Sequence, residues 1–279
     1  MAPPAAAEVT AHYARGGLLA RLEAALRDDG ADPLNPTLEA LAPYDQFHGR
    51  GLEATEEVAG LMRAAPGSHW LDIGSGIGGP ARYFAQRFGC RFTGIDLTPE
   101  FCEVARELTR RLGLHDRVDF QFGNALAMPF ADMSFDGACS MNVSMNIVDK
   151  AALYREIHRV LRPGAGLILS ELAAGDGRPL EYPTPWAADA GASFLATLEQ
   201  TLAGLADAGF EVVHARSTLE QAKAYGARSR ALVERGKQPP HRAVMLIHRE
   251  QATAAMANIA RALGDGRVVP VEIVARRPG

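Results

Sequence analysis

Apolar residues recur along this chain at two different spacings, and the change from one to the other falls near residue 67. From Val9 to Arg27 they recur every three or four residues, which predicts an amphipathic helix that ends at Asp28. The same spacing predicts a short helix from Thr37 to Pro43 and a longer one from Leu52 to Ala64. Three helices are therefore expected before the first strand.

Beyond residue 67, short apolar runs alternate with amphipathic segments, which predicts an α/β fold with a mostly parallel sheet and helices on both of its faces. About 50 residues separate the last two strands, far more than a hairpin needs. Most of them favour helix, in two segments at 219–236 and 250–263. The expected strands are 69–73, 91–95, 118–122, 135–140, 166–172, 211–215 and 268–275, and the expected helices between the first six are 80–88, 99–112, 150–161 and 199–208.

These elements predict a seven-stranded Rossmann-like sheet with additions at both ends of the chain. We expect four parts: an N-terminal helical lid (1–66), the Rossmann-like core (67–216), a helical cap insertion (217–266) and the last strand of the core (267–279).

Composition narrows the class of protein. In the 279 residues, 47% hydrophobic and 22% charged residues are typical of a globular chain, and no apolar run is long enough to span a membrane. The N-terminus lacks the charged start and apolar run of a secretory signal, so a cytoplasmic location is expected. A net charge of -4 argues against a nucleic-acid partner. Cys90, Cys102 and Cys139 show no ligand spacing, so we expect free, buried thiols and no metal site.

A glycine-rich loop follows the first expected strand and opens a helix. Its glycines, Gly74-x-Gly76-x-x-Gly79, match the dinucleotide fingerprint, and Asp96 about 20 residues on could hold ribose hydroxyls. On that pattern alone an NAD-dependent oxidoreductase remains open. Asp72, directly before the loop, places a carboxylate where a pyrophosphate would prefer bare backbone donors. That carboxylate favours a positively charged cofactor.

The chain resembles the class I S-adenosylmethionine-dependent methyltransferases, in particular the small-molecule group that includes sarcosine/dimethylglycine and tocopherol methyltransferases. The resemblance covers residues 44–172. It rests on five further ordered motifs besides the glycine loop: Tyr44-Asp45-Gln46-Phe47-His48-Gly49, Ile95-Asp96-Leu97, Pro129-Phe130, Phe135-Asp136 and Val160-Leu161-Arg162-Pro163-Gly164.

The resemblance implies S-adenosylmethionine as cofactor and assigns residues to it. Asp72, Gly74, Ser75 and Gly76 would form the loop around its methionine part. Asp96 and Leu97 would contact ribose and adenine, and Asn124 and Ala125 the adenine. Tyr44, on the lid, and Asn142, after the fourth strand, complete the expected cofactor residues.

The chain departs from the family pattern where substrate chemistry is decided. Gly123-Asn124 stands where a Gly-Asp pair is usual, and an amide can still bind an exocyclic amine. The segment 140–146 replaces a version that carries an acid and a histidine. The identity of the acceptor therefore stays open.

Methyl transfer needs alignment of donor and acceptor and exclusion of water, and it needs a base only when the acceptor must lose a proton. His48 is the candidate general base, because imidazole titrates near neutral pH. His241, Met245 and His248 are expected to be structural, and Met128 and Met256 to lie in the core. The expected acceptor site comprises Asn146, Glu171, Tyr182 and Trp186.

We predict methylation of N, O or C of a small molecule, hydrophobic or amphipathic rather than a free amino acid, because the cap is long and apolar. Alternatives are a non-catalytic module that binds S-adenosylmethionine, the NAD-dependent oxidoreductase, and a methyltransferase acting on RNA or protein, which the acidic balance disfavours. A homodimer stays open, since the first helix could pair with a second subunit.

Overall fold

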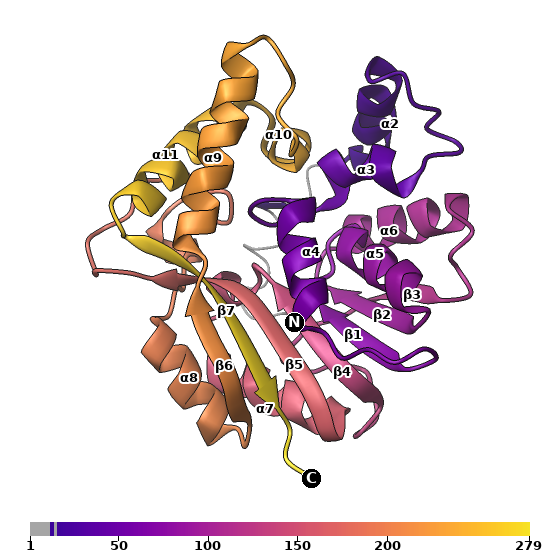
Figure 1. Ribbon diagram of the computed structural model, residues 1–279, viewed down its shortest axis with the longest axis vertical. Helices are drawn as coiled ribbons and strands as arrows, with labels where there is room; N and C mark the ends of the chain where they lie inside the picture. The colour runs from indigo at the N-terminus through magenta and orange to yellow at the C-terminus, as the bar shows by residue number, and fades with distance from the viewer. Residues whose placement is uncertain (1–11, 14–15) are drawn as a thin grey trace.

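The computed structural model describes residues 12–13 and 16–279 (Figure 1). The beginning of the predicted first helix, from Val9, lies largely outside the described residues. Its remainder is α2 (Leu18–Asp28), which buries leucines at steps of four, Leu18, Leu22 and Leu26. The amphipathic spacing of this segment is thus what packs it onto the rest of the molecule.

Two further helices precede the sheet. The hydroxyl of Thr37 accepts a hydrogen bond from the backbone of Ala40 and caps α3 (Leu38–Asp45). The helix continues two residues beyond its predicted end at Pro43, which lies inside it. α4 (Leu52–Leu61) follows, three residues shorter than predicted.

The seven predicted strands form one sheet in the order β3-β2-β1-β4-β5-β7-β6. All pairs among the first five strands are parallel, while β7 is antiparallel to both of its neighbours. The mostly parallel Rossmann-like sheet is therefore confirmed. The strands are β1 (His69–Ile73), β2 (Arg91–Asp96), β3 (Val118–Phe122), β4 (Phe135–Met141), β5 (Leu161–Ala174), β6 (Glu211–Ser217) and β7 (Val268–Arg276).

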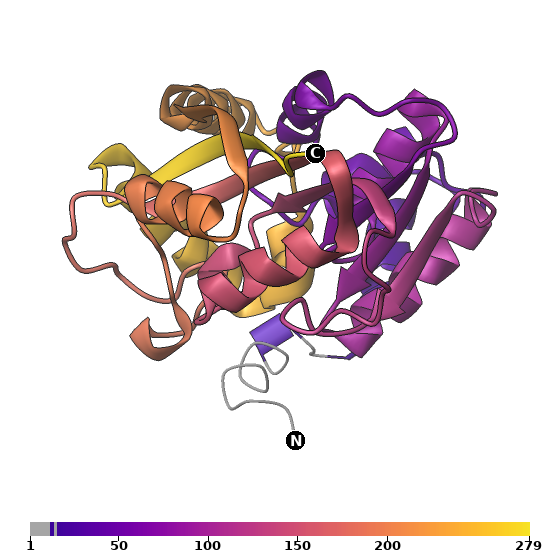
Figure 2. The same ribbon diagram turned by 90° about the horizontal axis from the view of Figure 1, so that it is seen from below.

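Helices cover both faces of the sheet, as the sequence predicts. In β1, Trp70 joins the core under α4 and α5, while Leu71 joins the core under α7 and α8. Figure 2 shows α4 and α7 on opposite sides of the strands. The helices that follow the strands are α5 (Gly79–Phe88), α6 (Pro99–Arg111), α7 (Lys150–Val160) and α8 (Leu198–Asp207).

β5 is longer than predicted. Arg162-Pro163-Gly164 was expected to end a helix that reaches Leu161, with the strand beginning at Gly166, but Leu161 already pairs with Phe135 of β4. The amide of Gly164 donates to the carbonyl of Arg277 at 2.8 Å. This pairing holds the segment extended directly after α7.

The insertion between β6 and β7 is helical, and it holds one helix that the sequence did not predict, α10. In Figure 1 its helices stand above the upper ends of β6 and β7, opposite α2 and α3. Met128 is buried, as expected, but the placement of Met256 in the core is wrong: it is 44% exposed, because it lies on a cap helix with one open face. The insertion contains α9 (Leu219–Glu234), α10 (Ala243–His248) and α11 (Ala252–Gly264).

All three cysteines are free and buried, as predicted. Among the described residues, no helix is both long and apolar enough to cross a bilayer.

Candidate functional site

Two adjoining cavities lie at the carboxyl ends of the parallel strands, where open α/β sheets bind ligands. The larger, of about 620 Å³, is lined by the glycine loop and by the ends of β2, β3 and β4. The smaller, of about 300 Å³, lies between the lid, the sheet and the cap. Tyr13, Phe47 and Asn142 line both, so the cavities meet at these three residues. We call them the loop cavity and the cap chamber.

The glycine loop needs its glycines. Gly74 and Gly76 have φ of 67° and 53°, in the left-handed region that other residues avoid. A Cβ on Gly74 would lie 2.3 Å from the side chain of Val143, and one on Gly76 would lie 3.0 Å from the ring of Phe47. The loop thus presents bare backbone to the cavity.

Asp96 holds the loop in shape. Its Oδ2 accepts a hydrogen bond from the amide of Gly76 and its Oδ1 one from the amide of Thr98, both at 2.8 Å. Burial raises the pKa of Asp96, while these amides act in the opposite direction. Asp96 lines the loop cavity together with Leu97, as expected.

The side chains of Asp72 and Ser75 are buried and do not line the loop cavity. They are therefore not placed to contact a ligand there directly. Asp72 Oδ2 and Ser75 Oγ have no hydrogen-bond partner among the described residues. Burial raises the pKa of Asp72 to about 7. The other oxygen, Asp72 Oδ1, accepts a weak hydrogen bond from Cys139 Sγ at 3.8 Å, so the carboxyl group is buried with one oxygen unsatisfied, which is costly for its charged form.

The remaining polar residues of the loop cavity come from the turns after β3 and β4. Asn124 and Ala125 line the cavity, as expected, and Asn124 Oδ1 accepts from the amide of Leu126 at 2.9 Å. Asn146, expected in the acceptor site, lines the loop cavity instead, and its Oδ1 has no hydrogen-bond partner among the described residues. Asn146 is the last residue of the 3-10 turn η1 (Ser144–Asn146), which follows β4.

Asn142 joins the two cavities, and its φ of 56° is left-handed. With its amide oriented to satisfy both neighbours, its oxygen accepts from the amide of Gly49 at 3.1 Å and its nitrogen donates to the carbonyl of Ser170 at 3.3 Å. Asn142 therefore ties the lid to β5.

The cap chamber is mostly apolar, with Glu171 and Trp186 in its wall as expected. Glu171 accepts hydrogen bonds from Ser140 Oγ at 2.7 Å and from the amides of Val143 and Ser144 at 2.9 and 3.0 Å. Burial still raises the pKa of Glu171. This carboxylate holds the turn after β4, and Trp186 Nε1 donates to Ser193 Oγ at 2.9 Å.

His48 lines the cap chamber and is almost fully buried. Its Nε2 lies 3.1 Å from Thr55 Oγ1, and its Nδ1 lies 3.3 Å from the carbonyl oxygen of Gly49. Burial, with smaller effects of His241 and Arg50, lowers the pKa of His48 to about 3. The sequence-based reason for choosing His48 as general base, titration near neutral pH, is therefore wrong for this site.

Two expected site residues point elsewhere. The hydroxyl of Tyr44 donates to Asp29 Oδ2 at 2.7 Å, and the guanidinium of Arg242 lies 4.5 Å from the centre of its ring. Tyr44 thus joins the lid to the cap instead of contacting the cofactor. Tyr182 packs against the apolar cluster around Trp186 and is not among the described residues that line either cavity.

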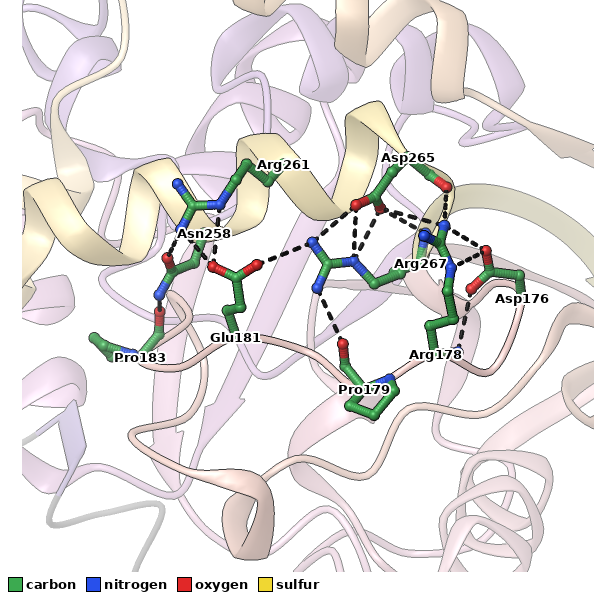
Figure 3. Close-up of polar contacts among 9 residues, drawn as sticks. All are labelled: Asp176, Arg178, Pro179, Glu181, Pro183, Asn258, Arg261, Asp265 and Arg267. Carbon is green, nitrogen blue, oxygen red and sulfur yellow. Dashed lines mark hydrogen bonds and ion pairs between the residues drawn. The ribbon is translucent and has the colours of Figure 1, made fainter.

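Polar contacts hold the loop that carries Trp186 against the cap, as Figure 3 shows. Asn258 of α11 donates to the carbonyl of Pro183 at 2.9 Å, and Arg261 pairs with Glu181 at 2.5 Å. Arg267 donates to the carbonyl of Pro179 at 3.0 Å. These contacts fix one wall of the cap chamber.

Tyr13 and Phe47 at the junction were not among the expected site residues, whereas Ala222, Val244 and Ile259 line the cap chamber and belong to the apolar cap from which the sequence predicts a hydrophobic acceptor. Phe47 and Phe101 pack edge to face with ring centres 5.2 Å apart. Phe47 lies within the quoted lid motif, which could have identified it. Among the described residues, no cluster of three or more His, Cys, Asp or Glu could hold a metal ion.

Comparison with known proteins supports the resemblance. The family model described as a methyltransferase domain matches residues 71–169. Over 115 residues the chain is 42% identical to the 24-methylenesterol C-methyltransferase 2 of Oryza sativa subsp. japonica, covering 41% of this chain and 31% of that protein. The family expected from the motifs is confirmed: residues 71–169 are a methyltransferase domain.

Solved structures share the whole fold. The geranyl diphosphate C-methyltransferase from Streptomyces coelicolor A3(2), in complex with Mg²⁺, geranyl-S-thiolodiphosphate and S-adenosyl-L-homocysteine, has a TM-score of 0.68 at 18% identity over 99% of both chains. The [4+2]-cyclase SpnF has a TM-score of 0.64 at 25% identity over 94% of both chains. The chain spans 31% and 53% of the length of the first two curated relatives that it matches.

Proposed function

We propose that the protein is an S-adenosylmethionine-dependent methyltransferase that acts on a small hydrophobic or amphipathic molecule. The observation that carries the proposal is the junction of the two cavities at Tyr13, Phe47 and Asn142. A donor bound against the glycine loop and an acceptor bound under the cap would meet there. The names of relatives and neighbours agree with such an activity.

The loop cavity fits the proposed cofactor. Its volume of about 620 Å³ lies within the range of about 300–1,000 Å³ that small-molecule sites occupy. Gly74 and Gly76 would hold the methionine part with bare backbone, Asp96 and Leu97 the ribose and adenine, and Asn124 and Ala125 the adenine edge. When bound, the cofactor supplies a methyl group on a positively charged sulfur. The buried carboxylate of Asp72 would favour that positive ligand across a short distance.

This chain's residues would mainly position the acceptor and exclude water, which suffices for an in-line displacement. Phe47 and Asn142 would narrow the passage between the cavities. Glu171 and Trp186 would hold the chamber wall, and His48 would contact the acceptor.

The apolar chamber wall supports a hydrophobic or amphipathic acceptor, methylated on nitrogen, oxygen or carbon.

We also keep as proposals the cytoplasmic location, a homodimer, and the division into lid (1–66), core (67–216), cap (217–266) and last strand (267–279).

A second candidate function is binding or conversion of a ligand without methyl transfer. It is favoured by the 25% identity to SpnF, which is described as a [4+2]-cyclase although it shares this fold. A fold does not by itself fix the chemistry of its site.

Two measurements test the proposal. Calorimetry with S-adenosylmethionine, S-adenosylhomocysteine and NAD should detect micromolar binding of the first two and none of NAD. Incubation with methyl-labelled cofactor and a panel of phenols, amines and prenyl lipids should then transfer label to at least one acceptor. Cofactor binding with no transfer to any of them would favour the second candidate, and binding of NAD alone would overturn the proposal.

A further inference from the structure

The cap (217–266) carries positive charge in a chain that is negative overall. It contains eight Lys and Arg residues against four Asp and Glu, a net charge of +4, whereas the whole chain carries -4. An excess of one sign over part of a surface attracts ligands of the opposite sign to that part. Because the cap forms one side of the cap chamber, a charged ligand that approaches the chamber from this side is expected to be an anion.

Three arginines of the cap are already paired with carboxylates elsewhere in the chain. They line neither cavity, and their pairs hold the cap against the lid and against the loop that carries Trp186. These pairs are Arg228 with Glu53 at 2.5 Å, Arg242 with Asp29 at 2.6 Å and Arg261 with Glu181 at 2.5 Å. Their charges are therefore not available to a ligand.

Arg230 of α9 differs from these three, because it lines the cap chamber. Among the described residues its guanidinium takes part in no hydrogen bond or ion pair, not even with Glu234 one turn further along the helix. Arg230 is also exposed, and an exposed residue that lines a cavity stands at its opening. An unpaired guanidinium thus lies where a ligand would enter the chamber.

Gly226, one turn before Arg230, lies under this guanidinium. A Cβ on Gly226 would be 3.6 Å from Arg230 Nη1, so the guanidinium folds back along its own helix. Gly226 itself lines the cap chamber, which places the guanidinium beside the chamber wall. A glycine inside a helix costs about 1 kcal/mol relative to alanine, and Gly226 lies in the middle of α9. Its bare backbone leaves open space beside the guanidinium for a ligand.

The other charged residues in the chamber wall have partners of their own. These partners are Glu57 for Arg50 at 2.8 Å, Ser140 and the turn after β4 for Glu171, and Glu220 for Lys223 at 3.3 Å. Lys223 lies about two helical turns before Arg230, on the same face of α9, and adds positive charge to that face. Of the charged groups that line the chamber within the described part of the chain, Arg230 is the one left for a ligand.

We propose that Arg230 binds an anionic group, a carboxylate or a phosphate, of an acceptor whose apolar body fills the cap chamber. The planar guanidinium presents a fork of N–H donors that matches the oxygens of both groups. The inference rests on the proposed function and deepens it by naming the substrate class, an anionic amphiphile. Because Arg230 lines the cap chamber and not the loop cavity, the anionic group orients the molecule, and the atom that is methylated lies in another part of it.

Three ligands with the same apolar chain test the site, since octanoate and octyl phosphate carry an anion and octanol does not. Calorimetry on the full chain with S-adenosylhomocysteine present should show about fivefold tighter binding of the anions, the upper range for an exposed ion pair. Arg230→Gln should remove this advantage and leave the affinity for octanol unchanged. Arg235→Gln is the matched control and should keep the advantage, because Arg235 is exposed at the end of the same helix and lines neither cavity.

Equal affinity for octanol and both anions in the wild-type chain, or an anion preference that survives Arg230→Gln, would overturn the inference. An equal loss in Arg235→Gln would also overturn it, because the overall charge of the cap would then be responsible. A preference for only one of the two anions supports the inference and identifies the group that the site takes.

Methyl transfer separates this inference from the proposed function. Transfer of label to neutral acceptors without any preference for anionic ones would leave the proposed function intact and overturn the inference. Anion binding that depends on Arg230, with no methyl transfer to any acceptor, would count against the proposed function alone.

Discussion

Arg242 of the cap and Asp29 of the lid, 213 residues apart in the chain, are joined by two hydrogen bonds of 2.8 and 2.6 Å. The backbone amide of Arg242 also donates to the carbonyl of Pro43 at 2.7 Å. These contacts close the space above the sheet from two sides, so the cap chamber depends on pairing between distant segments.

Asp29→Asn should destabilise the protein by about 1 kcal/mol at pH 7, since a bidentate arginine pair at a half-exposed position contributes about that much. Hydrogen bonds from Arg242 lower the pKa of Asp29. A carboxyl whose folded pKa is lowered stabilises the protein above its unfolded pKa, and this contribution disappears as the pH falls through the folded pKa. The difference between wild type and variant in urea unfolding should therefore shrink in acid. A difference that stays constant with pH would contradict the ionic role of the pair.

The predicted and the observed structure agree where local sequence decides the outcome. Strand periodicity, helix caps such as Thr37, and the glycine loop are local signals, because each depends on residues a few positions apart. The sheet, most helices and part of the loop-cavity lining, such as Gly74, Gly76 and Asp96, could thus be predicted. Resemblance added the identity of the domain.

What could not be predicted depends on contacts between remote segments. Tyr44 was expected to contact the cofactor, but its hydroxyl donates to Asp29, and the guanidinium of Arg242 lies over its ring. The ring of His241 lies 2.7 Å from the carbonyl of Gln46, 195 residues earlier in the chain. The low pKa of His48 likewise comes from burial under the cap, which no window of sequence encodes.

Gly76→Val should weaken binding of S-adenosylmethionine by at least about tenfold, equivalent to about 1.4 kcal/mol. The new side chain would begin 3.0 Å from the ring of Phe47 in a left-handed backbone conformation. Gly113→Val is the control, because Gly113 also has a positive φ, of 67°, and a Cβ there would meet no atom within 4 Å. Calorimetry should show an unchanged affinity for the control, and equal losses in the two variants would mean that backbone strain alone is responsible.

Asp72→Asn should change how stability depends on pH. Burial raises the pKa of Asp72 to about 7, so the folded chain binds a proton there that the unfolded chain has lost above about pH 4. This carboxyl therefore favours the folded state in acid, and its contribution is lost as the pH rises from about 4 to 7.

In the variant, stability should not fall in this way as the pH rises from about 4 to 7, because the amide does not titrate. At pH 8 the free energy of unfolding of the variant should therefore exceed that of wild type by at least about 1 kcal/mol. Asp119→Asn is the control, since Asp119 is exposed on β3. Parallel stability curves for wild type and Asp72→Asn would contradict the raised pKa. Weaker binding of S-adenosylmethionine by the more stable variant would show that the carboxylate serves the cofactor rather than the fold.

Ala222→Trp should separate the two cavities functionally. Ala222 lies on α9 and lines the cap chamber but not the loop cavity, so a large side chain there fills acceptor space and leaves the cofactor space intact. We expect methyl transfer to fall by at least about a hundredfold, about 2.7 kcal/mol in transition-state stabilisation, with the affinity for S-adenosylmethionine within about twofold of wild type. Ala224→Trp, at an exposed position of the same helix, is the control for the added bulk and should retain activity. Loss of cofactor affinity in Ala222→Trp would show that the cavities are not independent, and full activity would place the acceptor somewhere other than the cap chamber.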